Sequence, residues 1–219
     1  MPKNVYCIID TETLCVAKKW IYDIGCVLID KNGNKLHEQR WSVKEIMEIS
    51  GVEKLAYYGY KFKSFYHKLP TMPFELVKEE FHAIFEQFKV THICAYNLAF
   101  DFQAIQDTSK KLNTGEFFEK KFTFIDLWNA CCDSIFQQKK FPKIAIENNW
   151  ISPAGNYRTT AEVAYRFLTK NYKFKEGHTA LEDARIESEI LHRILKDKQK
   201  ITKNIIIFHP WKKVQRSVN

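Results

Sequence analysis

The chain has 219 residues, of which 45% are hydrophobic and 27% are charged, a balance that favours a globular domain with a sizeable core and excludes intrinsic disorder. No stretch approaches the roughly eighteen uninterrupted apolar residues of a membrane helix, and the apolar run in MPKNVYCIIDTET ends in acids, so we expect neither a membrane span nor a signal peptide. The net charge of +8 is compatible with binding a polyanion such as nucleic acid, and equally with a lysine-rich solvated surface.

The first part of the chain predicts three strands in succession. Residues 5–9 form a short apolar run between polar residues, which is typical of a buried strand. WIYDIGCVLID (20–30) and KLHEQRWSV (35–43) flank KNGN, in which Asn32-Gly33 supplies residues for a positive-φ hairpin turn. We therefore expect a hairpin directly after the first strand.

The remainder alternates helical and strand-like segments. Apolar residues at steps of three and four predict a helix over 71–88, with Thr71 and Pro73 near its start. Strand-like runs at 91–97 and 122–126 are followed by helical segments at 98–112 and 127–138. Two more helices are expected over 159–170, where Thr159 and Glu162 have capping-box spacing, and over 179–195. This order predicts a mixed α/β sheet with helices on its faces.

The six cysteines contain no C-x-x-C pair and no disulfide-rich spacing. Several lie in apolar, strand-like runs, where a free cysteine packs as a small hydrophobe. We therefore expect a reduced, cytoplasmic setting and no zinc site.

Two acids end the first predicted strand. In DTET, Asp10 and Glu12 stand at positions i and i+2, so their side chains project to the same face of an extended chain. Carboxylates this close repel each other unless a cation lies between them, and hard oxygen ligands of this kind suit Mg²⁺ or Mn²⁺. The alternative is a polar strand end in solvent.

Two further acids lie at expected helix starts. Asp101 stands among apolar neighbours in YNLAFDFQAI, either as a helix-start residue favoured by the dipole or as a partly buried ligand. Asp183 follows His178 by five residues in EGHTALEDA. On one continuous helix these two would point about 140° apart. Gly177 indicates instead that His178 lies on the turn entering the helix, where both side chains could face one cleft.

The order and context of these residues resemble the DEDDh 3′–5′ exonucleases, the DnaQ-like proofreading class of the RNase H-like superfamily. The matching residues are Asp10 and Glu12 in DTET, Asp101 in YNLAFD, and His178 with Asp183 in HTALED. YDIGCVLID also resembles the strand after the first motif, and the likeness covers about residues 4–197. It implies an RNase H-like α/β fold with a mixed five-stranded sheet, three antiparallel strands and then parallel strands, flanked by helices.

The resemblance also implies a role for each residue. Asp10, Glu12, Asp101 and Asp183 would bind two Mg²⁺ or Mn²⁺ ions. Asp10 would bridge both ions, Glu12 and Asp183 would hold the ion that carries the nucleophilic water, and Asp101 would support the second site. His178 would be the general base, because an imidazole with a pKa of about 6.5 accepts a proton near neutral pH.

Contacts to the substrate are expected from neighbours of the acids, namely Thr11, Thr13, Leu14, Asn97 and Phe100. Leu14 would be the apolar wedge against the terminal base, and Asn97 would support the loop that carries Asp101. The chain departs from many relatives in TETLCVAKKW, which lacks the glycine of their Thr-Gly-Leu, so the hold on the 3′ end is less defined than the metal site. Asp126 is interpreted as a helix N-cap or a neighbour of the ligands.

The predicted function is a metal-dependent 3′–5′ exonuclease acting on single-stranded DNA ends, in replication, repair or proofreading, with a DNA polymerase as a candidate partner. Two alternatives stay open. One is an exoribonuclease acting on short RNA or tRNA ends, and the other is a non-catalytic, polymerase-associated module that binds nucleic acid. NYRTTAEVAYRFLT and other segments also resemble exonuclease-like proteins of bacteriophages, which would place the protein in a host cytoplasm.

Two segments stand apart within the expected single domain of residues 1–219. They are an aromatic and basic insertion around 44–73 and a basic tail at 197–219. The rings and lysines of residues 54–68 are arranged as in sequence-tolerant single-strand sites, although the same rings could fill the core. The tail could follow a nucleic-acid backbone, cover a sheet edge or bind a partner protein.

Overall fold

A computed structural model describes residues 4–15, 17–118, 121–199, 201–205 and 207–214. Its strands are β1 (Val5–Thr13), β2 (Ile21–Asp30), β3 (Lys35–Val43), β4 (Thr71–Met72), β5 (His92–Ala95) and β6 (Thr123–Asp126). Its α-helices are α1 (Lys44–Met47), α2 (Val52–Leu55), α3 (Phe74–Phe88), α4 (Leu98–Leu112), α5 (Leu127–Asp133), α6 (Phe141–Glu147), α7 (Ala161–Thr169) and α8 (Ala180–Lys196). Four short 3₁₀ turns are η1 (Gly59–Lys61), η2 (Tyr66–Lys68), η3 (Ile135–Gln137) and η4 (Pro210–Lys213). None of the helices in the described part of the chain is both long and apolar enough to span a bilayer.

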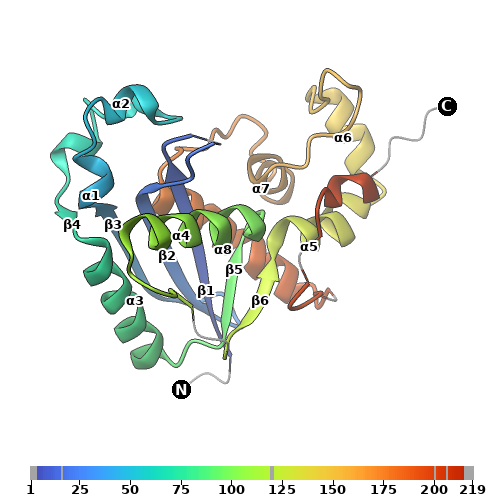
Figure 1. The fold of residues 1–219 in the computed structure, drawn as a ribbon. Coiled ribbons are helices and arrows are strands. Elements are labelled where there is room, and N and C mark those ends of the chain that lie inside the picture. Colours follow the sequence, from blue (N-terminus) through green and yellow to red (C-terminus); the bar gives the residue numbers. More distant parts are fainter. Residues whose placement is uncertain (1–3, 16, 119–120, 200, 206, 215–219) are drawn as a thin grey trace.

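The strands form one mixed sheet in the order β4-β3-β2-β1-β5-β6, with helices on both faces (Figure 1). β1, β2 and β3 pair antiparallel, whereas β5 and β6 run parallel to β1. The predicted hairpin and the predicted change from antiparallel to parallel strands are therefore confirmed. The central position of β1 places its carboxyl end between the hairpin and the βα crossovers.

Alternation along β1 divides its side chains between the two faces of the sheet. Val5, Cys7 and Ile9 pack into the cluster that includes α3 and α4 residues. Tyr6 and Ile8 pack on the opposite face with Ala184 and other residues of α8. Since side chains alternate along a strand, Asp10 and Glu12 continue the face that α8 covers, and Thr11 continues the face of α4.

Within the described residues the sheet has six strands, one short edge strand more than the five expected. Thr71 and Met72 pair with Ser42 and Val43 of β3, although the sequence pattern assigned Thr71 to a helix. A residue before proline is disfavoured in the helical conformation, so Met72 stays extended and α3 begins at Phe74, after Pro73.

Two local predictions differ from the structure. In the β2–β3 turn only Gly33 has a positive φ, of 82°, and the Asp30 carboxylate closes the turn by accepting hydrogen bonds from the backbone N–H groups of Asn32 and Asn34. Thr160, not Thr159, caps α7 by accepting from the Val163 amide. Thr159 instead accepts a hydrogen bond from the indole of Trp128, at 2.8 Å.

The insertion and the tail both pack against the domain. Phe62 and Tyr66 of the insertion are buried in the main core, while Tyr57 and Tyr60 are 69% and 72% exposed, so only some of the rings fill the core. In the tail, the Asn204 backbone N–H and side-chain oxygen hydrogen bond to the backbone of Phe124 on the edge strand β6. The tail therefore covers a sheet edge, and its residues 200, 206 and 215–219 lie outside the described part.

Candidate active site

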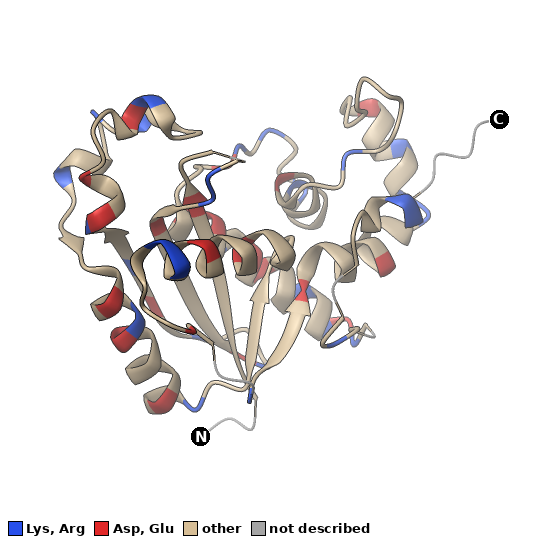
Figure 2. Cartoon of the chain, in the orientation of Figure 1, with Lys and Arg blue, Asp and Glu red and all other residues tan. Residues whose placement is uncertain are grey.

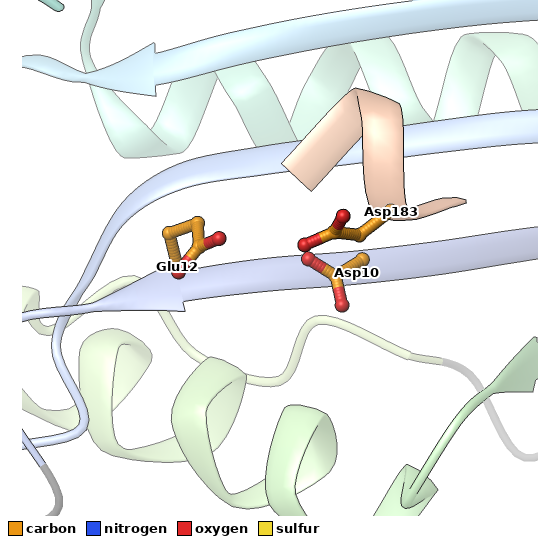
Figure 3. A group of neighbouring side chains, drawn as sticks. All are labelled: Asp10, Glu12 and Asp183. Carbon is orange, nitrogen blue, oxygen red and sulfur yellow. The ribbon is translucent and has the colours of Figure 1, made fainter. Parts of the chain in front are cut away.

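Three carboxylates converge at the carboxyl end of β1. One oxygen each from Asp10, Glu12 and Asp183 lies within 4.8 Å of the others (Figure 3). Asp10 and Glu12 come from β1, and Asp183 comes from the first turn of α8. The period-two spacing of the first pair and their common face with α8 bring these distant segments together.

Close packing of α8 on β2 makes this convergence possible. Gly25 of β2 pairs with Asp10 in the β1–β2 ladder. A Cβ at Gly25 would lie 2.5 Å from the backbone nitrogen of Leu181, so the absence of a side chain lets the first turn of α8 rest on the strand.

A buried carboxylate on β2 fixes the N-terminus of α8. Asp23 accepts hydrogen bonds from the Ala180 amide and the Tyr66 hydroxyl, both at 3.1 Å. Its other oxygen forms a 2.6 Å ion pair with Arg40 of β3. Asp23 therefore ties α8 to the insertion and to β3. This role was not predicted from the sequence, where its signal is a single acid inside an otherwise apolar strand.

Asp101 lies next to the three-acid group but is not part of it. It is buried in the first turn of α4, as its sequence context predicted, on the opposite face of β1. The Thr11 hydroxyl donates a 2.8 Å hydrogen bond to its carboxylate. The negative charge of Asp101 still raises the pKa of Asp10, and both residues line the same cavity.

Burial and mutual repulsion raise the pKa values of these acids. Burial is the main cause for each of them; it raises the pKa of Glu12 to about 9, with the Asp183 charge next, and that of Asp183 to about 7. The pKa of Asp101 is raised to about 7 by burial, against the hydrogen bond from Thr11. Clustered carboxylates of this kind are stabilised by cations.

The donor set fits divalent cations such as Mg²⁺ or Mn²⁺. All candidate ligands are carboxylate oxygens, which hard cations prefer. Oδ1 of Asp183 is buried and has no hydrogen-bond partner among the described residues, so it is available to a metal ion. A cation there would replace repulsion between acids by attraction.

Glu187 is a further acid at this site that the sequence analysis missed. It lies one helical turn after Asp183 on α8, is buried, and accepts a 3.1 Å hydrogen bond from the Tyr96 amide. After burial, its charge is the largest cause of the raised pKa of Asp10. The i+4 spacing from Asp183 was the signal that could have found it.

His178 lies on the turn before α8, as predicted, with a φ of 50°. Its Nδ1 is 3.9 Å from an Asp183 oxygen and 4.0 Å from a Glu176 oxygen. Its ring stacks on Tyr58, with centroids 4.3 Å apart and planes 9° apart. Burial lowers the pKa of His178, and the nearby positive charge of Lys61 lowers it further.

The acids and His178 line a cavity of about 470 Å³. Four expected substrate contacts, Thr11, Thr13, Asn97 and Phe100, also line it. Tyr57 and Tyr58, from the aromatic run considered as a single-strand site, line it too. The remaining lining residues were not predicted from the sequence: Tyr96, Trp128, Thr159, Thr160, Ala161, Glu176 and Glu187.

Leu14, the fifth expected substrate contact, does not line the cavity. Leu14 follows the last residue of β1, Thr13. It is buried in the main core, where its exposure is 0%. Its role as a wedge against the terminal base stays a prediction from the sequence.

Asp126 has a structural role near the site. It caps α5 by accepting a 3.1 Å hydrogen bond from the Asn129 amide, as its position after a strand predicted.

Lys and Arg are spread over many elements and do not follow one helix or strand (Figure 2). Lys61 is a basic residue whose charge acts on the site itself, because it lowers the pKa of both Glu12 and Asp183.

Comparisons with known proteins give matches in structure but not in sequence. No family model matches the chain, and no curated protein matches its sequence. A full-length 3′-exonuclease gives a TM-score of 0.68 at 12% identity, over 96% of this chain and 90% of that one. A 3′-exonuclease described in specific recognition of the 3′ end of a histone mRNA stem-loop gives 0.68 at 13% identity, over 94% and 68%.

Exonuclease I of E. coli in complex with a dA16 oligonucleotide gives a TM-score of 0.57 at 13% identity, over 90% of this chain and 41% of that one. At identities this low, the likeness establishes the fold alone. The chain therefore has the RNase H-like α/β fold of these exonucleases, as the sequence predicted.

Proposed function

We propose that this chain is a metal-dependent 3′–5′ exonuclease that hydrolyses phosphodiester bonds at the 3′ end of single-stranded DNA. One observation carries the proposal. Asp10, Glu12 and Asp183 converge beside His178 at a single cavity, on the fold of the matched 3′-exonucleases.

Asp10, Glu12 and Asp183 would hold one divalent cation, and Asp101 would support a second beside Asp10. Mg²⁺ and Mn²⁺ are the ions that this all-oxygen set suits. When bound, such a pair activates water and stabilises the attacking and leaving oxygens of the displacement. The Thr11 hydroxyl holds the Asp101 carboxylate in place, because it donates a 2.8 Å hydrogen bond to it.

His178 would accept the proton of the attacking water. Its lowered pKa keeps the imidazole neutral at pH 7, which is the form that a general base requires. Its place on the turn before α8 keeps it beside Asp183, with which it lines the cavity. The leaving oxygen takes its proton from solvent.

Substrate binding would use the rings and polar groups around the acids. Tyr57 and Phe100 line the cavity, and aromatic rings stack on unpaired bases of any sequence. Thr13 and Asn97 also line it and would contact the sugar or phosphate of the terminal nucleotide. Lys61, whose charge acts on Glu12 and Asp183, would contact a phosphate.

An exoribonuclease is the second candidate. The match to a 3′-exonuclease that recognises a histone mRNA stem-loop favours it, since that structure has the same TM-score as the first match. The two candidates share the metal site and the base, and they differ only in the sugar of the substrate. A protein that distinguishes RNA from DNA must contact the 2′-hydroxyl.

One experiment tests both candidates. Matched DNA and RNA oligonucleotides labelled at the 5′ end are incubated with the protein in Mg²⁺ or Mn²⁺, with EDTA and Asp183→Asn as controls. We expect a descending ladder with DNA that is absent in both controls. A ladder with RNA alone would favour the second candidate. Internal cuts or digestion in EDTA would contradict both, and binding without product would indicate the non-catalytic module.

Residues 1–219 are proposed to form a single catalytic domain, with the insertion around 44–73 at one side of the cavity. The insertion contributes Tyr57 and Tyr58 to the lining. Action in the cytoplasm, a polymerase partner, a role in replication, repair or proofreading, and a bacteriophage origin stay predictions from the sequence.

A further inference from the structure

The ring of His178 is held by stacking more than by hydrogen bonds. The Nδ1 distances of 3.9 and 4.0 Å to Asp183 and Glu176 exceed the about 3.2 Å limit of an N–H···O hydrogen bond. Tyr58, by contrast, lies almost parallel to the imidazole, with centroids 4.3 Å apart. The side chain of His178 is 33% exposed, so the imidazole would have room to rotate if this contact were lost.

Tyr58 belongs to a segment that the core anchors firmly. It stands between α2 and η1, and its ring meets Tyr57 and Tyr60 edge-on, at 5.0 and 6.3 Å. Directly after η1, Phe62 is buried in the main core. The imidazole therefore rests against a ring whose segment is anchored to the core by Phe62.

This placement sets Tyr58 apart from the other rings of its segment. Tyr57 and Tyr58 both line the cavity. Tyr57 is 69% exposed and can offer a face to a base, whereas one face of Tyr58 is occupied by His178. Tyr60 is 72% exposed and does not line the cavity.

We propose that Tyr58 is a positioning residue that holds the His178 imidazole in the orientation from which it takes a proton from the attacking water. This inference rests on the proposed function. Tyr58 would act through the orientation of His178 and would not bind the substrate itself. Its loss should therefore lower kcat and leave KM unchanged.

The kinetic test compares Tyr58→Leu, Tyr58→Phe and the control Tyr60→Leu. Aromatic pairs stabilise by an amount equivalent to about 3- to 10-fold in rate, so we expect Tyr58→Leu to lower kcat by about that factor. Tyr58→Phe keeps the ring and should stay within about twofold of the parent, and Tyr60→Leu should do the same. A loss in Tyr58→Phe equal to that in Tyr58→Leu would overturn the inference, because the hydroxyl would then be the acting group.

A double-mutant cycle with His178→Ala separates positioning from substrate contact. If Tyr58 acts through His178, Tyr58→Leu should cause no further loss of rate once the imidazole is gone. An equal loss in both backgrounds would show that Tyr58 acts on the substrate directly, and the inference would be wrong.

NMR gives a readout that does not depend on hydrolysis. The stacked Tyr58 ring should shift the His178 ring protons upfield, and the shift should persist in Tyr58→Phe and vanish in Tyr58→Leu. Absence of this shift in the parent protein would overturn the inference while leaving the exonuclease proposal intact. A parent protein with the shift but without hydrolysis would overturn the proposed function instead.

Discussion

Gly25 controls how closely α8 approaches the strand that carries Asp10. It pairs with Asp10 in the β1–β2 ladder, and the backbone of Ala180 and Leu181 lies directly over it. In Gly25→Ala, the added Cβ would lie 2.5 Å from the Leu181 nitrogen, where ordinary contacts are 3.4 Å or longer. The obstacle is backbone and not a flexible side chain, so the first turn of α8 has to move away from the sheet.

The displacement should affect function more than stability. Overpacking of this kind costs about 1–3 kcal/mol, which lowers Tm by roughly 2–12 °C in a chain of this size. The helix must retreat by about 1 Å, and a misplacement of that size at a reacting centre lowers rates by up to about 100-fold. Asp183 belongs to this turn, whereas Asp10 and Glu12 belong to β1, so the displacement would separate Asp183 from the other two acids. We therefore expect weaker metal binding and a 10- to 100-fold slower turnover.

The assay measures metal affinity by titration calorimetry, turnover on a labelled oligonucleotide, and Tm. Ala145→Val is the matched control, because Ala145 is fully buried in α6, an element that does not line the cavity. It should lower Tm by a similar amount and leave metal affinity and turnover unchanged. If Gly25→Ala lowered Tm but kept the parent's metal affinity and turnover, the packing of α8 on β2 would not be what assembles the site.

Three further predictions concern the acids and the histidine. His178→Ala should lower the rate by about 10²–10⁴ while metal affinity, measured by calorimetry, persists; loss of metal binding instead would contradict its role as base. Asp183→Asn should abolish hydrolysis and the rise in Tm caused by Mg²⁺, yet raise Tm in EDTA, since one repelling charge is gone. In EDTA the parent's Tm should fall as pH rises from about 4, where Asp and Glu ionise in the unfolded chain, to the raised folded-state pKa values of Asp183 (about 7) and Glu12 (about 9), and it should level off above them. Mg²⁺ should remove most of that fall; a Tm difference between Mg²⁺ and EDTA that stays constant from pH 5 to 9 would contradict this reasoning.

The sequence was sufficient for the parts of the site that depend on local periodicity. Asp10 and Glu12 share a face because they are two residues apart on a strand, and Asp101 is in the first turn of a helix because an apolar strand precedes it. The turn that carries His178 could also be predicted, since Gly177 indicates a turn before the start of α8. These features need no knowledge of which segments meet in space.

The remaining features depend on contacts between distant segments or on irregular backbone. Leu14 lies just after the end of β1, where the alternation of the strand no longer applies, and contacts with distant segments bury it in the main core. The partnership of Tyr58 with His178 joins segments that lie far apart in the chain. In the sequence, Tyr58 was one of six similar rings, with nothing to distinguish it from Tyr60.

The insertion contacts the candidate active site through two residues, Tyr66 and Tyr58. Tyr66 donates to Asp23, which also holds the first amide of α8, and Tyr58 stacks on the histidine of the turn just before it. The acids proposed to bind metal, by contrast, belong to β1, α4 and α8. Changes at Tyr58 should therefore alter proton transfer while the affinity for metal stays the same, whereas changes at Tyr66 would act through Asp23 on the first turn of α8, which carries Asp183.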